Sequence, residues 1–174
     1  MRRVAVLMTV LVLAAGCGDD NDNPAGPSNT GPIVFSAQLT AANEVPPVTG
    51  TEANGRGNVT ITFNVPRDAG GGVTGAGTAT FAIQLSGFAP GTPAILAHIH
   101  PGVAGQNGSP LVNTNLTPTA PLLLADGTVN VSITAPVTQT DAAAIMANPA
   151  AYYFNVHTAL NPGGAVRGQL TRTQ

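Results

Sequence analysis

The chain has 174 residues, of which only 8% are charged, and its formal net charge is −2. Six lysines and arginines cannot form the basic surface that nucleic acids require, so we expect no nucleic-acid partner. A single cysteine excludes an internal disulfide bond, so packing alone must hold the core. The 21 glycines and 15 prolines follow no fixed period, which is typical of many short strands joined by tight turns.

The start of the chain has the order of residues found in a bacterial export signal. Two arginines precede an apolar run from Val4 to Leu13, and three small residues then lead to Cys17. The run is about ten residues long, whereas a membrane-spanning helix needs about 20. Residues 13–17 resemble the lipobox of bacterial lipoproteins, in which the cysteine is lipidated, although Ala14 stands where leucine is commoner. We therefore predict a lipoprotein signal peptide at 1–17 with lipidation at Cys17; an ordinary signal peptide cut nearby is the alternative.

Residues 18–32 show no periodicity and contain no apolar residue larger than alanine or proline. Such a segment cannot bury enough apolar surface to fold, so we expect a disordered linker. Together with the signal, it predicts an extracytoplasmic protein of the bacterial cell envelope that contacts the membrane through its N-terminal lipid.

Beyond residue 32, apolar and polar residues alternate with the period of two that is typical of half-buried strands. The alternation is clearest in residues 59–65 and 79–86, and the glycines at 70–72 between them predict a hairpin connection. Further strands are predicted at 33–39, 93–100, 111–116, 129–133, 152–158 and 165–171. About eight short strands favour an all-β fold, either a sandwich or a Greek-key barrel.

One segment departs from the strand pattern. Residues 141–146 are rich in alanine and begin with an acid, which favours a short helix. We expect Thr140 to cap its start and the Asn148–Pro149 pair to end it. Such a helix would connect strands across one end of the domain.

Four sequence blocks occur in a characteristic order. They are LTAANEVPPV at 39–48, AHIHPGVAGQNG at 97–108, YYFNVHT at 152–158 and NPGGAVRGQ at 161–169. In sequence and in order these blocks resemble the CHRD domain, which was first described in chordin and occurs in many bacterial proteins. The resemblance places a CHRD domain at 33–172. It implies an immunoglobulin-like β-barrel distantly similar to copper/zinc superoxide dismutases, with no activity assigned to the domain itself.

All three histidines lie within these blocks. His98 and His100 are two residues apart on a predicted strand, so their side chains face the same side and can bind one metal ion. His157 lies on another predicted strand. Three imidazoles suit copper or zinc and leave a coordination position open.

A predicted hairpin carries His157 and turns at residues 161–164. A tight turn there would place Asn155 opposite Arg167, because paired residues share a face of the sheet. The polar face of the hairpin would then consist of Asn155, His157, Arg167 and Gln169. Glu44 would either pair with Arg167, which we favour, or offer its carboxylate to a metal.

The resemblance to superoxide dismutases has limits. There a His-x-His strand supplies copper ligands, and a later histidine and arginine complete the site. This chain has no fourth histidine, no visible zinc-binding loop and no disulfide, so we do not expect a dismutase rate. The histidines can instead hydrogen-bond to Asn155, Gln169 and the backbone as part of the fold.

No catalytic residues are predicted. The sequence lacks a Gly-x-Ser-x-Gly elbow, a phosphate-binding loop and a Gly-x-Gly-x-x-Gly motif. We therefore expect a lipid-anchored envelope protein with a non-catalytic binding or structural module, whose partner is an unknown envelope protein or ligand. The alternative is a copper- or zinc-binding domain that uses His98, His100 and His157.

Overall fold

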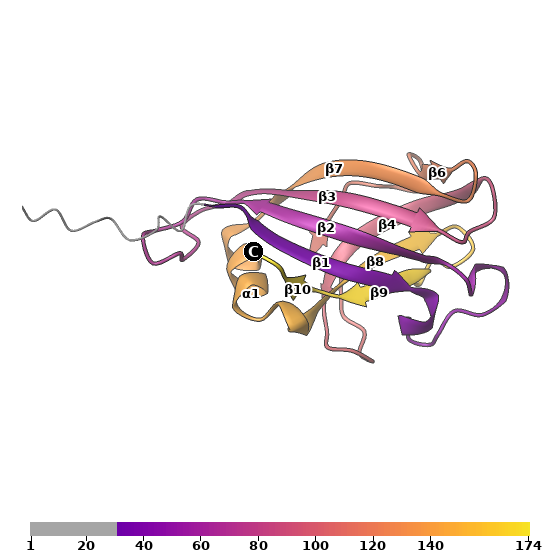
Figure 1. Ribbon diagram of the computed structural model, residues 1–174, viewed down its shortest axis with the longest axis horizontal. Coiled ribbons are helices and arrows are strands. Elements are labelled where there is room, and N and C mark those ends of the chain that lie inside the picture. Colours follow the sequence, from indigo (N-terminus) through magenta and orange to yellow (C-terminus); the bar gives the residue numbers. More distant parts are fainter. Residues whose placement is uncertain (1–30) are drawn as a thin grey trace, which may run out of the picture.

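Within residues 31–174, which the computed structural model describes, ten antiparallel strands form one sheet that curls into a nearly closed barrel (Figure 1). The strands are β1 (Ile33–Thr40), β2 (Arg56–Asn64), β3 (Gly77–Ser86), β4 (Thr92–Pro101), β5 (Val112–Asn113), β6 (Leu122–Leu124), β7 (Val129–Val137), β8 (Tyr152–Thr158), β9 (Val166–Gln169) and β10 (Thr171–Arg172). Their order around the barrel is β5-β4-β8-β9-β1-β2-β3-β7. The short strands β6 and β10 pair with β4 and β1. The predicted all-β class is confirmed.

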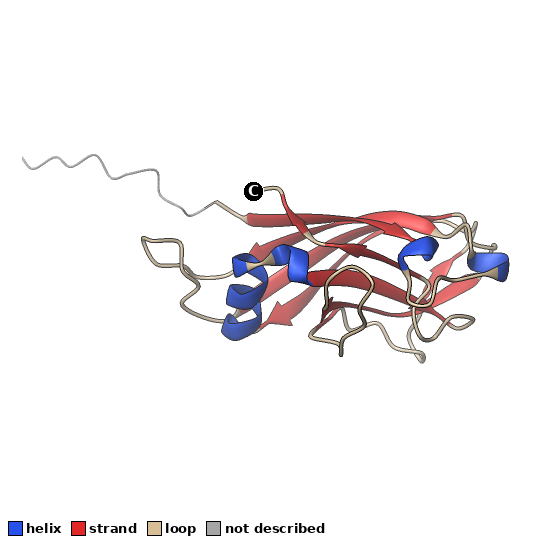
Figure 2. Cartoon of the chain, turned by 90° about the horizontal axis from the view of Figure 1, so that it is seen from below, coloured by secondary structure: helices blue, strands red, loops and turns tan. Residues whose placement is uncertain are grey.

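Helical segments lie at the two ends of the barrel (Figure 2). The α-helix α1 (Gln139–Ala147) and the 3-10 turn η3 (Pro149–Ala151) are at one end. The 3-10 turns η1 (Ala41–Asn43) and η2 (Gly50–Glu52) are at the other. None of the helices in residues 31–174 combines the length and apolar character needed to cross a bilayer.

The core fills the inside of the barrel because each long strand turns every second side chain inward. One row of paired positions runs from Phe35 on β1 through Ile61 on β2 and Phe81 on β3 to Ile133 on β7. From the opposite wall, the ring of Phe154 on β8 stacks on Phe81 at a centroid distance of 5.6 Å. Contacts of this kind join the two walls without a disulfide.

The outward face of β4, β8 and β9 differs from that of the other strands because it is also buried. Residues 97–100 and 153–158 are buried at every position, so both faces of these strands are covered. Three loops, residues 41–55, 102–111 and 159–165, which we call the covering loops, lie over this face. The side chains beneath them form a buried polar layer outside the apolar core.

The structure corrects several predicted boundaries of strands. The strand expected at 111–116 contains only Val112–Asn113, because Asn115 takes a left-handed conformation with φ 67° and ends it. The strand expected at 165–171 is divided at Leu170 into β9, which pairs with β8, and β10, which pairs with β1. The strand at 129–133 continues to Val137, and the short strand β6 has no counterpart in the prediction.

The helix begins earlier than the sequence suggested. Its cap is Thr138 rather than Thr140, because the Thr138 hydroxyl accepts a hydrogen bond from the Asp141 N–H and donates one to the Asp141 carboxylate. This exchange satisfies an otherwise free donor in the first turn. The helix ends before Asn148, as predicted.

Other predictions fall on residues that the structure does not describe. The signal peptide, the lipidation site Cys17 and positions 18–30 of the predicted linker lie outside the described residues.

Candidate metal centre

Strand pairing brings the three histidines into one cluster. His98 and His100 point to the outward face of β4, and His157 lies on the neighbouring strand β8, opposite Leu96. The ring centroid of His98 is 4.5 Å from that of His100 and 4.6 Å from that of His157. The three side chains are 4%, 5% and 6% exposed, and one nitrogen from each ring lies within 4.8 Å of the others. The cluster therefore has the composition and spacing of a possible metal site.

Backbone carbonyls fix the orientation of two of the rings. Nδ1 of His100 lies 2.8 Å from the carbonyl oxygen of Gly108, and Nδ1 of His157 lies 3.0 Å from that of Pro162. A carbonyl oxygen only accepts, so each Nδ1 carries the proton and each Nε2 keeps its lone pair. Neither Nε2 has a hydrogen-bond partner. Metal-binding histidines are commonly held in this arrangement.

Gly108 is required for the bond to His100. A side-chain carbon at this position would lie 1.8 Å from the Pro101 carbonyl oxygen. Only glycine allows the loop to approach the end of β4 this closely and bring its carbonyl oxygen to Nδ1 of His100.

His98 lies at the centre of the cluster. Neither of its ring nitrogens has a partner at hydrogen-bonding geometry. Burial lowers the pKa of His98 to about 3, and the nearby His157 and His100 lower it further, while Asn113 on β5 acts in the opposite direction. Burial also lowers the pKa of His100 and of His157, against the smaller effect of their carbonyl partners. All three rings are thus neutral at pH 7, as metal binding requires.

The polar layer continues from the histidines across β8 to β9. Asn155 is paired with His98 on one side and with Arg167 on the other, so the predicted pairing of Asn155 with Arg167 is observed. The Arg167 side chain is 2% exposed, and its guanidinium lies 4.6 Å above the ring of Tyr153.

Neutral acceptors on the covering loops hold the arginine. Nε of Arg167 donates to the Asn43 carbonyl at 2.6 Å, and Nη1 donates to the Gln106 carbonyl and to Oδ1 of Asn107 at 3.1 and 2.8 Å. Nη2 of Arg167 has no partner. The Arg167 side chain therefore joins two of the covering loops to β9 through hydrogen bonds to neutral groups, with no carboxylate among its hydrogen-bond partners.

Glu44 adds a carboxyl group to the same layer. Its side chain is 5% exposed, and burial raises its pKa to about 7, against the opposing effects of the Arg167 charge and a hydrogen bond from Asn155. In the described part of the chain no direct ion pair joins Glu44 to Arg167, so the pairing favoured from the sequence acts only through the electrostatic field.

Gln169 serves the fold rather than the histidines. The two N–H groups of its amide nitrogen are shared among the carbonyl oxygens of Gly102, Ala150 and Tyr152, which lie 3.0, 2.9 and 3.2 Å from that nitrogen. The suggestion that Gln169 hydrogen-bonds to a histidine is therefore not supported by these contacts.

The polar layer contains buried atoms without partners. Across residues 31–174 there are seven such side-chain atoms: Oε1 of Glu44, both ring nitrogens of His98, Nε2 of His100, Nε2 of His157, Oδ1 of Asn155 and Nη2 of Arg167. Each unpaired buried group costs about 1–3 kcal/mol. Their concentration in one layer fits a polar or ionic ligand better than a closed hydrogen-bond network.

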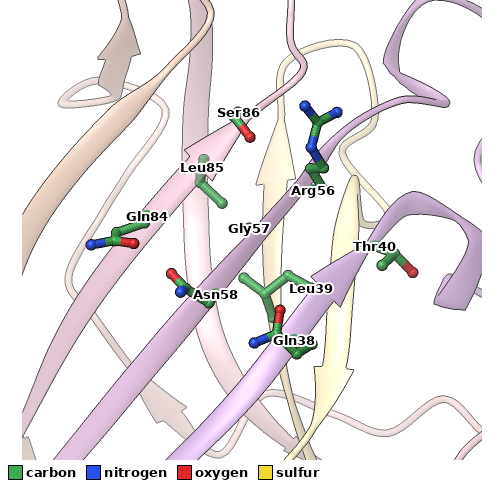
Figure 3. Close-up of a pocket in the computed structure, with 9 residues that line it drawn as sticks. All are labelled: Gln38, Leu39, Thr40, Arg56, Gly57, Asn58, Gln84, Leu85 and Ser86. Carbon is green, nitrogen blue, oxygen red and sulfur yellow. The ribbon is translucent and has the colours of Figure 1, made fainter.

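A separate cavity of about 450 Å³ lies on the outer face of β1, β2 and β3 (Figure 3). Its lining is mostly amides and hydroxyls, with one cation, and consists of Gln38, Leu39, Thr40, Arg56, Gly57, Asn58, Gln84, Leu85 and Ser86. It contains no histidine or acid, so we assign it no role in the metal centre.

Comparison with models of known protein families agrees with the resemblance seen in the four sequence blocks. The model of the CHRD domain matches residues 35–170. The chain belongs to the CHRD domain family. Among curated proteins, no sequence matches the chain. The histidines and the covering loops thus all lie within the CHRD domain.

The lowered pKa values predict how metal-free protein responds to acid. Histidine titrates near 6.5 in the unfolded chain, whereas the pKa of all three is lower in the fold, reaching about 3 for His98. The unfolded state therefore binds more protons below pH 6.5, and stability is lost as the pH falls toward 3. Each histidine lowers the free energy of unfolding by up to about 1.4 kcal/mol for each pH unit of acidification.

The titration of Glu44 has the opposite effect on stability. Because its pKa rises from 4.5 to about 7, its contribution to the free energy of unfolding is full below pH 4.5 and is lost as the pH rises through 7.

The histidines can be tested by urea unfolding in the presence of chelator. The free energy of unfolding should fall below pH 6.5, and its slope against pH should be smaller in His98→Gln. An identical slope in the natural protein and in His98→Gln would contradict the lowered pKa of His98.

Proposed function

We propose that this CHRD domain is a non-catalytic module that binds one copper or zinc ion through His98, His100 and His157. The observation that carries the proposal is the convergence of three neutral, buried imidazoles whose nitrogens lie within 4.8 Å of one another. Imidazole is a preferred ligand of both metals. The carbonyl bonds to two of the rings leave Nε2 free to coordinate.

The distances require only a small adjustment. A tetrahedral ion with metal–nitrogen bonds of about 2.0–2.1 Å separates its ligand nitrogens by about 3.4 Å. The rings must therefore close by at most about 1.4 Å, which side-chain rotation can supply. Three ligands leave a fourth position for water or for another ligand.

The surroundings favour binding over turnover. Surface cavities of about 290 and 460 Å³ flank Glu44, and neither has a histidine in its lining. A substrate would reach the cluster only after the covering loops moved, whereas a metal ion needs much less space.

Metal analysis tests this proposal. Protein stripped with chelator and reloaded should retain one zinc or copper ion, and a metal concentration of 100 times Kd should stabilise it by about 2.7 kcal/mol. For a domain of this size the Tm should rise by roughly 5–10 °C. The double variant His98→Gln/His100→Gln should lose both effects.

The matched control is Gln84→Ala, on the exposed face of β3, which should bind metal like the natural protein. Equal metal content in the double variant and the natural protein would reject the site. A wild-type protein that binds neither metal would favour the purely structural role of the layer.

The same proposal includes the location of the protein. The order of residues 1–17 supports export and lipidation at Cys17, which would display the domain in the cell envelope within reach of an envelope protein or ligand. In a bacterial host, the natural protein should incorporate labelled palmitate and sediment with membranes. Cys17→Ser should do neither. Membrane association without label in both proteins would contradict the lipid anchor.

A further inference from the structure

We propose that Glu44 is the buried counter-charge of the metal centre and makes it prefer divalent over monovalent ions. This inference rests on the proposed function. It concerns a residue outside the three ligands, on a covering loop more than fifty positions away from His98 in the sequence.

The charges in the polar layer give the first reason. The three imidazoles are neutral, and Arg167 already places one positive charge in the layer, where it is 2% exposed. A divalent ion would raise the buried charge to three. Glu44 is the acid of this layer, so it alone among the described residues of the layer can offset that charge.

Glu52, the other buried acid of the described residues, has hydrogen-bond partners outside the polar layer. Glu52 is 3% exposed, and its Oε2 accepts hydrogen bonds from the Thr158 hydroxyl and the Asn161 amide. These bonds join η2 to the end of β8 and to the turn that follows it. Glu52 therefore serves the fold and provides a matched control for Glu44.

The carboxyl group of Glu44 lies beside Gly164 and the side chain of Asn155. A side-chain carbon on Gly164 would lie 2.6 Å from Oε2 of Glu44 and 2.8 Å from Nδ2 of Asn155, so glycine makes room for both groups. Asn155 is paired directly with His98. The carboxyl group of Glu44 therefore lies next to the residue that is paired with His98.

The carboxyl group also lacks a direct partner of opposite charge. Oε1 of Glu44 has no hydrogen-bond partner, and the hydrogen bonds of Arg167 go to Asn43, Gln106 and Asn107. The raised pKa of Glu44 agrees with this incomplete compensation. A cation bound by the histidines would supply the missing positive charge.

The attraction scales with the charge of the ion. At a fixed distance, the Coulomb energy between a carboxylate and a divalent ion is twice that for a monovalent ion. Removing the carboxylate charge should therefore reduce the logarithm of the affinity twice as much for Zn(II) as for Cu(I). A residue that only stabilised the covering loop would affect both ions equally.

The test is Glu44→Gln, which keeps the size of the side chain and removes its charge. Dissociation constants for Zn(II) and Cu(I) would be measured at pH 8 by competition with chromophoric chelators, with Cu(I) kept under anaerobic conditions. We expect affinity losses of about 100-fold for Zn(II) and about 10-fold for Cu(I). Glu52→Gln should leave the ratio of the two affinities unchanged.

Equal losses for the two ions, or no loss for Zn(II), would overturn the role of Glu44 while leaving the three-histidine site intact. A natural protein that binds neither ion would instead overturn the proposed function. If Glu44→Gln does not fold, Glu44→Met, which buries an apolar group of similar length, takes its place with the same expected ratio and the same criteria.

Discussion

Antiparallel pairing between β4 and β8 determines what this barrel can bind. It places Ile99 opposite Phe154 on the inner face, where both belong to the core, and it places His98 opposite Asn155 on the outer face. The same ladder of hydrogen bonds thus positions an apolar layer and a polar layer at once. A shift of one residue in register would exchange them, so the burial of Phe154 also fixes the histidines.

The polar layer lies under the covering loops and is costly to bury. Elsewhere the outward side chains meet solvent, as Thr60 on β2 and Gln84 on β3 do. Over β4, β8 and β9 the loops exclude water and leave unpaired nitrogen and oxygen atoms beneath them. A CHRD domain that needed only stability would gain by replacing these groups with apolar ones. The free-energy cost of these unpaired polar groups is consistent with a polar layer that binds a ligand.

The sequence predicted the local parts of this arrangement well. Period-two alternation identified the long strands, and the tight turn at 161–164 gave the observed pairing of Asn155 with Arg167. The spacing of His98 and His100 placed them on one face. These inferences succeeded because each depends on residues close together in the chain.

Features that depend on distant contacts were not predictable in the same way. The hydrogen bond between the Gly108 carbonyl and His100 depends on how closely a loop approaches Pro101. The position of Glu44 depends on a loop that meets β8 and β9, which follow more than a hundred residues later in the chain. The roles of Gly108 and Gly164 also depend on such contacts, because at both positions the lack of a side chain makes room for neighbouring groups of the site. The early end of β5 at Asn113 was not predicted, because asparagine permits the left-handed conformation found at Asn115 but does not require it.

The most direct test of the central claim is the anomalous diffraction of a crystal of the zinc-loaded protein. The account predicts a single strong peak beneath the covering loops, with a ring nitrogen of His98, His100 and His157 each at about 2.0–2.1 Å. Zinc found only at the protein surface, with the three imidazoles unchanged, would contradict it.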